Sequence, residues 1–518
     1  MTTRRRRPPP ALLLSAAATG TALLCAAAAV PPTLAGDWPT WGRDATRNMV
    51  SPETGLPDAV TVAKTADGEA DLKASKGVAW TAKLGSQTYG NPVVAGGRVY
   101  VGTNNANPRD PKYAGDRGVL MCLDEKTGNL VWQLVVPKLP AGRNVDWEDC
   151  GVCSSPAVDG DRVYAVTNRC EVVALDAAGL ANGNDGATDE AAHAANPGEP
   201  PVEQGPTDAD VVWRYDLRRE LGVFPHFQAA SNPLVVGDRL YVVTSNGVDW
   251  TDKHVPAPYA PALVCLDKKT GKLLAQERSG ISGRTFYCNW SAPAFGDVGG
   301  RPTLVFGGGD GFLYGFEPEP DAAAGTLKEL WRIDCNPPGY RSRDGKPVKY
   351  RDGKGPSEII ATPVIVGGKV YVPIGQDPEH GTGAGALSCV TVEDKGGKPT
   401  PTIAWQNAEV GRSMSTPAVL NGLIVLPELA GIVHCLDAAT GAEVWRHDVE
   451  SNAWGSALVA DGRAYVGNES GELVILAAGR QEKLIGKADL LGPVFSTPVA
   501  ANGTLFVSTG TTLYALKK

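Results

Sequence analysis

Long hydrophobic segments are scarce in this 518-residue chain, and after residue 35 no apolar run is long enough to span a bilayer. Segments with a helical period of 3.6 residues are also missing, whereas 62 glycines and 40 prolines separate short runs with strand-like alternation. Histidine is rare, and no Ser/His/Asp hydrolase constellation stands out. The sequence therefore predicts an all-β protein without a transmembrane segment, and we assign no catalytic residue.

Positive charge is in the minority, because 49 Lys and Arg residues face 57 Asp and Glu residues and give a net charge of −8. Residues 1–35 contain four arginines, an Ala/Leu-rich core and "PTLA" before Gly36, which is typical of a secretory signal peptide. We expect cleavage near Ala35 and export to the periplasm or the extracellular space. Loss of the four arginines takes the net charge from −8 to −12, which disfavours nucleic acid as a partner.

One short phrase returns eight times: a small residue, one more residue, a proline slot, an apolar run, a glycine turn and a strand like "RVYV". The slot holds Pro92, Pro156, Pro233, Pro293, Pro363, Pro417, Ala457 and Pro498. A second phrase follows, clearest at residues 118–132 and 431–445, where Asp124 starts a turn and Gly128 sits where a positive φ is needed. Each repeat therefore predicts four antiparallel strands, which we call A to D.

Four-stranded units repeated around a ring make a β-propeller, and eight copies predict eight blades. The eighth unit stops after strand C, whereas residues 77–84 (GVAWTAKL) form an orphan D strand with Trp80 in the tryptophan slot. We predict that this strand completes the last blade. The expected organisation is a signal peptide at 1–35, a leader at 36–76 and the propeller at 77–518.

Connections from D to A and from B to C emerge on one face of a propeller, which we call the loop face. Most insertions belong to it, at residues 104–117, 133–152, 246–261, 334–359 and 376–385. Long loops on a rigid scaffold are where binding residues concentrate. The insertion at 180–210 is a C-to-D connection, and its Gly/Asn/Glu/Pro-rich composition predicts a flexible, solvated excursion on the opposite face.

A mostly polar column lies five residues before the proline slot and is expected at the channel mouth on the loop face. Together with two D-to-A loop residues it gives the candidate ligand-binding set Gln87, Asp149, His226, Gln228, Glu358, Arg412 and Asn452. A ring that mixes Glu358 with Arg412 could bind a polar ligand, or it could only hydrate the pore and pair charges. Three residues before the slot, a mostly bulky apolar column is expected to pack inside the blades.

Four cysteines, Cys122, Cys265, Cys389 and Cys435, share one repeat column with alanine and glycine, which predicts buried core positions. Cys150, Cys153 and Cys170 approach one rim of the loop face. An oxidising compartment favours a disulfide between Cys170 and one of the other two, while pairing with Cys288 or Cys335 stays open. Three thiolates with Asp149 could instead hold zinc, but "CGVC" lacks a second pair, so we assign no metal.

The "LD-x-x-TG-x-x-x-W" phrase at 123–132 and 436–445 resembles the repeat of the pyrroloquinoline-quinone (PQQ) type propeller family. The stretch "DWPTWGRDATRN" (37–48) resembles the leader before such propellers in many exported proteins. The resemblance covers residues 77–518 and implies the propeller fold. The family includes quinoprotein alcohol dehydrogenases, the outer-membrane assembly lipoprotein and exported propellers without assigned chemistry, so the fold does not select a function.

A quinoprotein dehydrogenase of this family implies an Asp base beside the quinone, a Ca²⁺ ion held by carboxylate and amide oxygens, and often a vicinal disulfide. This chain has no Cys-Cys pair, and "DWED" (146–149) is only weakly similar to the "DEWDYD"-like catalytic stretch. We therefore expect no cofactor. The expected function is that of an exported, monomeric, non-catalytic binding or scaffold protein whose loop face binds a protein, a glycan or an envelope component. The alternative is a divergent alcohol or sugar dehydrogenase that uses PQQ with Ca²⁺.

Overall fold

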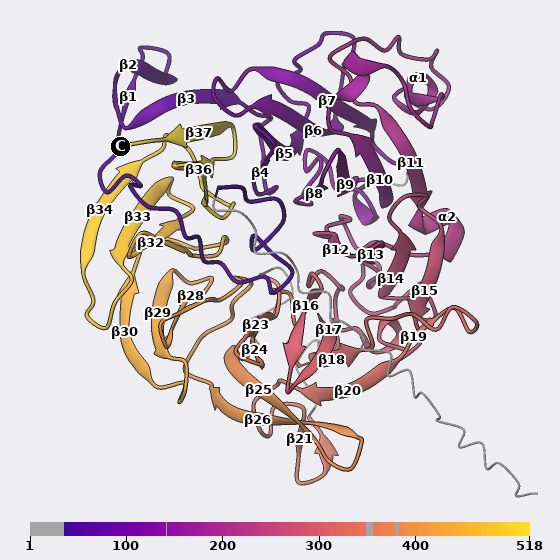
Figure 1. Cartoon of the computed structure of the whole chain (residues 1–518), viewed down its shortest axis with the longest axis vertical. Coiled ribbons are helices and arrows are strands. Elements are labelled where there is room, and N and C mark those ends of the chain that lie inside the picture. Colours follow the sequence, from indigo (N-terminus) through magenta and orange to yellow (C-terminus); the bar gives the residue numbers. More distant parts are fainter. Residues whose placement is uncertain (1–35, 141, 349–355, 379–382) are drawn as a thin grey trace, which may run out of the picture. The chain divides into compact units, whose positions relative to one another are not determined.

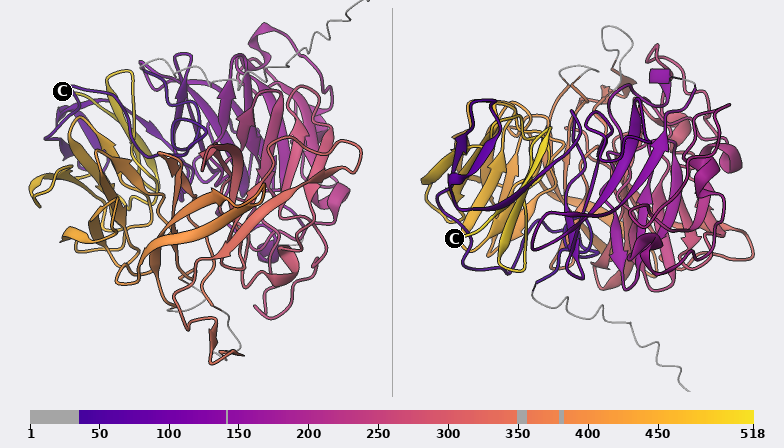
Figure 2. Two further views of the ribbon diagram at one scale, coloured as in Figure 1. Left: turned by 60° about the horizontal axis from the view of Figure 1, so that its bottom comes forward. Right: turned by 90° about the horizontal axis from the view of Figure 1, so that it is seen from above.

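Eight four-stranded antiparallel sheets form the blades of a β-propeller in the computed structural model, which describes residues 36–140, 142–348, 356–378 and 383–518. The predicted signal peptide and parts of the loops at 334–359 and 376–385 lie outside the described residues. Strand A of each blade lies nearest the ring axis and strand D lies outermost (Figure 1). Figure 2 shows the blades from two other directions. No helix among the described residues is long and apolar enough to cross a membrane.

The first four blades follow the chain in order. Blade 1 holds β4 (Val93–Ala95), β5 (Arg98–Asn104), β6 (Arg117–Asp124) and β7 (Leu130–Pro137); blade 2 holds β8 (Ala157–Asp159), β9 (Arg162–Val166), β10 (Glu171–Asp176) and β11 (Val211–Asp216). Blade 3 holds β12 (Leu234–Val236), β13 (Arg239–Val243), β14 (Leu263–Asp267) and β15 (Leu273–Glu277), with β19 (Thr326–Leu327) added in parallel; blade 4 holds β16 (Ala294–Val298), β17 (Arg301–Gly307), β18 (Phe312–Phe316) and β20 (Glu329–Asp334).

The last four blades continue the ring. Blade 5 holds β23 (Val364–Val366), β24 (Lys369–Ile374), β25 (Ala386–Asp394) and β26 (Pro399–Asn407); blade 6 holds β27 (Ala418–Leu420), β28 (Leu423–Pro427), β29 (Ile432–Asp437) and β30 (Glu443–Asp448). Blade 7 holds β31 (Leu458–Ala460), β32 (Arg463–Gly467), β33 (Glu472–Ala477) and β34 (Leu484–Asp489); blade 8 holds β35 (Val499–Ala501), β36 (Thr504–Ser508), β37 (Thr512–Leu516) and β3 (Val78–Lys83).

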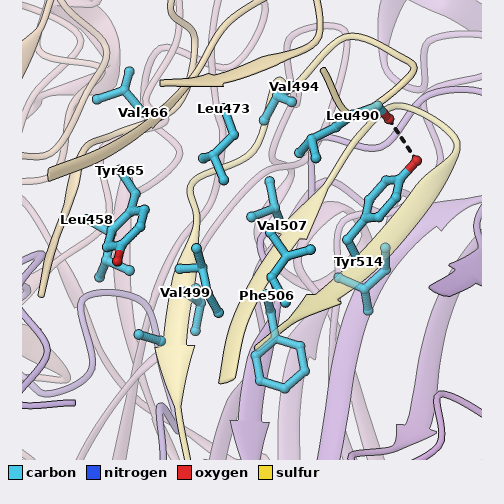
Figure 3. Packing of buried hydrophobic residues seen from close by; sticks show 14 of the residues in the cluster. Leu458, Tyr465, Val466, Leu473, Leu490, Val494, Val499, Phe506, Val507 and Tyr514 are labelled. Atoms are coloured by element: carbon cyan, nitrogen blue, oxygen red, sulfur yellow. Dashed lines mark hydrogen bonds between the residues drawn. The ribbon is translucent and has the colours of Figure 1, made fainter. Parts of the chain in front are cut away.

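Short elements decorate the blades. They are the hairpins β1 (Thr61–Lys64) with β2 (Ala70–Lys76) and β21 (Ser342–Arg343) with β22 (Lys346–Pro347), the helices α1 (Glu190–His193) and α2 (Leu217–Leu221), and the 3₁₀ turns η1 (Gly142–Asn144), η2 (Gly179–Asn182) and η3 (Ser282–Arg284). Blade faces pack through buried aliphatic and aromatic side chains, as Figure 3 shows for blades 7 and 8. There the Tyr514 hydroxyl donates to the carbonyl of Leu490 at 2.7 Å, so a buried polar atom is paired inside this core.

The C-to-D turns form as the second phrase predicts. Asp124 Oδ1 accepts hydrogen bonds from the backbone N–H of Lys126 (3.1 Å) and of Thr127 (3.0 Å), and also from the Thr127 hydroxyl (2.8 Å). These bonds, led by the hydroxyl, lower the pKa of Asp124 below its ordinary value. Gly128 has a φ of 71°, which disfavours any residue with a Cβ.

The glycine of this turn also receives the tryptophan of the preceding blade. A Cβ at Gly128 would lie 2.5 Å from Cε3 of Trp80, whose indole N–H donates to Glu125 O at 3.0 Å. The same indole-to-turn hydrogen bond recurs at four other junctions, Trp132 to Ala177 O, Trp213 to Lys268 O, Trp405 to Ala438 O and Trp445 to Gly479 O. The repeated phrase therefore has two functions. Its aspartate and glycine form the hairpin turn, and its tryptophan packs on the same turn of the next blade.

A belt of hydrogen bonds joins the blades near the axis, and it explains the polar residue before the proline slot. Ser155 N donates to Asn232 Oδ1 (2.8 Å), and Asn91 N donates to Ser155 Oγ (3.3 Å). The belt continues from Thr416 N to Ser456 Oγ, from Ser456 N to Thr497 Oγ1 and from Thr497 N to Asn91 Oδ1. The last of these bonds links blade 8 to blade 1.

The leader lies against the innermost strands of the ring, and Figure 1 shows it crossing the middle of the propeller. Strand A is the edge strand on the inner side of each blade, so its N–H groups that face the ring axis need partners. The leader supplies them in turn, through Val94 N to Trp38 O, Val158 N to Pro39 O, Phe295 N to Ala45 O, Ile365 N to Thr46 O, Val419 N to Asn48 Oδ1, Val459 N to Met49 O and Asn502 N to Gly36 O. Residues 36–51 thereby contact the inner edge of nearly every blade.

Arg47 completes this contact at blade 3. Its guanidinium donates to Pro293 O (2.8 Å), Trp41 O (2.8 Å) and Pro233 O (3.0 Å), and the side chain is 0% exposed. Burial lowers the pKa of Arg47 to about 9, so it remains protonated at neutral pH. A buried charge that is held by neutral carbonyls is stable only while all of them stay in place.

The predicted orphan strand is β3, and it pairs antiparallel with β37 at the outside of blade 8 (Figure 1). Its partners include Trp80 opposite Ala515 and Ala82 opposite Leu513. The first blade strand after the leader and the last strand of the chain thus share one sheet. Residues that are more than 400 positions apart in the sequence lie side by side in this blade.

Most of the insertion at 180–210 is exposed, as its composition suggested, but the segment also has structure of its own. It contains the end of η2 and all of α1, and it packs along the outer edges of blades 1 and 2. Asp208 accepts hydrogen bonds from Lys112 Nζ (2.6 Å) and from the Tyr113 hydroxyl (2.9 Å), both in the loop 104–117. A few buried polar contacts such as these hold the segment, and composition does not reveal them.

The junction at Gly128 gives a direct stability test. We expect Gly128→Ala to lower the free energy of unfolding by roughly 3 kcal/mol, because the new methyl adds a clash with Trp80 to the cost of a positive φ. Gly97→Ala is the matched control, since Gly97 has a φ of 74° and no atom within 4 Å of its Cβ position. It should cost about 1 kcal/mol. Urea unfolding checks both variants, and equal losses would contradict the docking of Trp80 on Gly128.

Candidate functional site

The D-to-A loop between blades 1 and 2 carries a compact group of titratable side chains on the loop face. Lys138 Nζ lies 2.7 Å from Asp146 Oδ1, and Asp146 Oδ2 accepts hydrogen bonds from Leu139 N (2.9 Å) and Asn168 Nδ2 (2.8 Å). Burial raises the pKa of Asp146 despite these partners. The group fixes the loop that presents Cys150 and Cys153.

Cys150 and Cys153 form a dithiol with two different electrostatic environments. A hydrogen bond from the Cys153 thiol lowers the pKa of Cys150, and the nearby Lys138 ammonium lowers it further. The same bond, together with burial, raises the pKa of Cys153 well above its ordinary value. Cys150 is therefore the more nucleophilic of the two thiols.

The expected disulfide between Cys170 and one of these thiols is not formed in the structure, where every described cysteine is a free thiol. Cys170 Sγ instead donates to Thr244 O at 3.4 Å, and Cys288 Sγ donates to Ser245 O at 3.1 Å. Cys170 points toward blade 3 because it is a left-handed turn residue with a φ of 63°. The sequence places Cys170 on the correct rim but does not reveal this turn. The four cysteines of the repeat column are buried, as predicted.

His226 lies in an aromatic group where blades 2, 3 and 4 meet. It is fully buried, its Nδ1 donates to Val248 O at 2.7 Å, and its ring centroid lies 3.9 Å from that of Phe227 and 4.2 Å from that of Tyr287. Trp147 approaches Phe227 edge-on at 4.8 Å. The imidazole thus serves as a packed, hydrogen-bonded member of this group.

The candidate polar residues do not make one continuous ring. Gln228 is buried, and its Nε2 donates to Gly151 O at 2.6 Å, so it joins the loop that carries Asp149. Asp149 itself is exposed, and its N–H donates to Asp116 Oδ2 at 2.8 Å. Gln228 and His226 thus belong to one loop beside blade 3, whereas Asp149 contacts the loop 104–117 of blade 1.

The remaining candidates lie in separate places. Glu358 is buried and accepts the N–H of Asp377 at 3.0 Å; it lies beside Gly375, against which Arg412 also packs. Gln87 accepts a hydrogen bond from the Tyr89 hydroxyl at 3.4 Å. The exposed Asn452 amide donates to Glu469 Oε2 at 2.8 Å. The repeat column predicts that these residues occupy equivalent positions in their blades, but it does not show which side chains point toward the ring axis.

The apolar column three residues before the proline slot is partly exposed in all eight blades instead of packing inside them. Its members are Tyr89, Cys153, Ala230, Trp290, Ile360, Met414, Trp454 and Phe495. Rings from neighbouring blades contact each other, with centroids 5.2 Å apart for Tyr89 and Phe495 and 6.0 Å apart for Trp454 and Phe495. These three rings thus pack between blades, and every member of the column stays partly exposed.

Two aromatic side chains that the sequence analysis passed over are the most exposed large hydrophobic residues in the described part of the chain. Trp250 is 66% exposed and Tyr259 is 99% exposed, and both lie in the loop 246–261 of blade 3. Asn246 Nδ2 braces this loop by donating to Ala257 O at 3.0 Å, and Asp249 Oδ1 accepts the N–H of Thr251 at 3.0 Å. The signal available in the sequence was the presence of two large aromatic residues in a long polar loop.

The residues at the channel mouth fit PQQ with Ca²⁺ poorly. The Glu358 carboxylate is buried and holds the backbone of Asp377, while the Asn452 amide is engaged with Glu469. Cys150 and Cys153 are separated by two residues, so they cannot form a vicinal disulfide. The absence of a cofactor nevertheless stays a prediction.

A family model described as outer membrane protein assembly factor BamB matches residues 41–184 and 429–518. These segments include most of the leader, blade 1, blades 7 and 8, and both complete copies of the tryptophan phrase. The chain therefore resembles the PQQ-like β-propeller repeat family over somewhat less than half of its length. This PQQ-like propeller is 32% identical over 74 residues to the outer membrane protein assembly factor BamB of Shewanella oneidensis. The match covers 14% of the chain and 19% of the relative, so it spans about a fifth of that protein's length.

Solved propellers resemble the fold at low sequence identity. BamB from Moraxella catarrhalis has a TM-score of 0.49 and 14% identity, with 85% of this chain and 96% of that chain covered. A europium-containing methanol dehydrogenase has a TM-score of 0.48 and 13% identity, with 94% and 99% covered. The quinohemoprotein alcohol dehydrogenase of Comamonas testosteroni has a TM-score of 0.48 and 16% identity, with 93% and 80% covered. The three resemblances carry no information on activity.

The dithiol gives a prediction on reactivity. In reduced protein we expect iodoacetamide to modify Cys150 several-fold faster than Cys153 at pH 7, because the thiolate is the nucleophile and the pKa of Cys150 is lowered. The pH midpoint for Cys150 should lie below about 8.5, the value of an ordinary thiol. Lys138→Met should move this midpoint upward. Peptide mass spectrometry measures both rates, and faster labelling of Cys153 would contradict the assignment.

Proposed function

We propose that this PQQ-like propeller is an exported, monomeric, non-catalytic binding protein of the cell envelope that captures its partner on the loop face. The partner is a protein, a glycan or another envelope component, and Trp250 and Tyr259 are its anchors. The secretory character of residues 1–35 supports export after cleavage near Ala35. The net charge of −8 agrees with a partner other than nucleic acid.

The observation that carries the proposal is the exposure of Trp250 and Tyr259 on one braced loop. Large aromatic side chains are costly to leave in water, and they are enriched among the residues that dominate binding energy at interfaces. Hydrogen bonds within the loop fix its backbone beforehand, which reduces the entropy lost on binding. The name of the matched relatives, an outer membrane protein assembly factor, favours a protein as the partner.

Site-specific photo-crosslinking in cells tests this use of the loop face. A photoreactive amino acid at Tyr259 should give a discrete adduct, and Trp250→Ala should reduce its yield at least tenfold without changing the circular dichroism spectrum. The matched control is Lys269, which is 72% exposed in the C-to-D turn of the same blade, on the opposite face. Equal adducts from positions 259 and 269, or no adduct from position 259, would contradict the proposal.

Reconstitution separates the proposal from the dehydrogenase alternative. Purified protein incubated with PQQ and Ca²⁺ should show no dye-linked oxidation of alcohols or sugars and no bound quinone absorbance after gel filtration. The poor fit of the mouth residues to this group is the physical reason. Clear activity would replace the binding function with that of a divergent PQQ-dependent alcohol or sugar dehydrogenase.

A further inference from the structure

Three carboxylates meet at the base of the blade 2 insertion, outside the loop face. Asp176 ends β10, Asp185 lies within the insertion and Asp210 directly precedes β11. Each offers one oxygen, and these oxygens all lie within 4.8 Å of one another. The two ends of the insertion and its first turn therefore converge on one small volume of negative charge.

Asp210 gives this cluster a property that a solvated acidic patch lacks. The residue is 0% exposed; its Oδ2 accepts the N–H of Asp185 at 3.0 Å, but its buried Oδ1 has no hydrogen-bond partner among the described residues. Burial raises the pKa of Asp210, and the charges of Asp176, Glu190 and Asp185 raise it further. A buried carboxylate oxygen without a partner is costly, so it points to a missing positive ligand.

Positive charge from the protein compensates the cluster only in part. Among the ion pairs of the described residues, one reaches these three carboxylates, from Arg162 Nη1 to Asp176 Oδ2 at 2.6 Å. Other cations of the insertion are engaged elsewhere, since Arg214 pairs with Asp189 and Lys112 pairs with Asp208. In the part of the chain that the structure describes, no ion pair reaches Asp185 or Asp210.

We propose that Asp176, Asp185 and Asp210 bind a Ca²⁺ ion that fixes the insertion to blade 2. The donors are all oxygens, which suits a hard cation and not zinc, and ligand oxygens on opposite sides of a Ca²⁺ ion lie up to about 5 Å apart. Asn182 can add an amide oxygen, because its Nδ2 lies 3.4 Å from Asp176 Oδ1 and a flip of the amide exchanges the two atoms. This site is independent of the proposed function of the loop face.

The ion would act where the insertion leaves and rejoins the blade. Trp132 of blade 1 lies against Gly179, and its indole N–H donates to Ala177 O at 2.9 Å, next to Asp176. Further along the insertion, Asp208 holds Lys112 and Tyr113 of blade 1. Calcium at the base would therefore stabilise the contact between the insertion and blades 1 and 2.

Metal titration of the full protein, after removal of divalent ions with a chelating resin, tests the site. Ca²⁺ up to about 10 mM, which covers the weak range of extracellular calcium modules, should raise Tm in a saturable manner. Tb³⁺ should show luminescence sensitised by excitation of tryptophan, and excess Ca²⁺ should displace it. Trp132→Phe should reduce this luminescence without abolishing the Tm response to Ca²⁺.

Two variants and a control make the result decisive. Asp210→Asn should raise Tm of the metal-free protein, because it removes a buried charge, and it should lose the response to Ca²⁺. Asp185→Asn should weaken Ca²⁺ binding at least tenfold, whereas Glu203→Gln, an exposed carboxylate of the same insertion outside the cluster, should respond like the unmodified protein. No Ca²⁺ response in the unmodified protein, or an unchanged response in both aspartate variants, would overturn the proposal.

Discussion

The contact of a tryptophan with the glycine turn of the next blade is the constraint on which this ring depends. The indole needs a flat surface without a Cβ, and a glycine at positive φ provides it, while the turn carbonyl accepts the indole N–H. Five of the eight junctions have this indole hydrogen bond. Because the tryptophan lies in strand D and the glycine lies in the turn after strand C, one local phrase specifies both a blade and its docking to a neighbour.

The inner edge of the ring is held by a different device. Each strand A would leave backbone N–H groups unpaired toward the axis, and the leader pairs most of them while the belt of serine, threonine and asparagine side chains joins the blades. Arg47 adds a buried charge that four blade or leader carbonyls share. With both edges fixed, the loops can lengthen and vary without loss of the fold, which is why long insertions such as the one that carries Trp250 lie there.

The sequence predicts the local and repeated parts of this structure well. Turn chemistry at Asp124 and Gly128, the eight blades and the burial of the cysteine column all depend on contacts within one repeat, which periodicity reveals. The pairing of β3 with β37 could also be inferred, because the orphan strand matches the one strand that the last repeat lacks. Features that recur in every sequence repeat therefore recur in the structure of every blade that has them.

Contacts that occur once could not be read in this way. Cys170 turns toward Thr244 because of a single left-handed residue, and Gln228 is buried because one loop folds over it. The insertion looked solvated by composition, although a few polar contacts such as that of Asp208 with Tyr113 hold it in place. Each of these outcomes depends on a tertiary partner that no repeat column contains.

Hydrogen exchange of a Trp80→Ala variant tests the central claim, that docking of β3 closes the ring and stabilises it as a whole. Mass spectrometry should show faster exchange in β35–β37 of blade 8 and in β4–β7 of blade 1, because the substitution removes the contact with Gly128 and the bond to Glu125 O. Protection in the other blades should fall with the lower global stability. Faster exchange confined to residues 78–83, with both blades unchanged, would contradict the account.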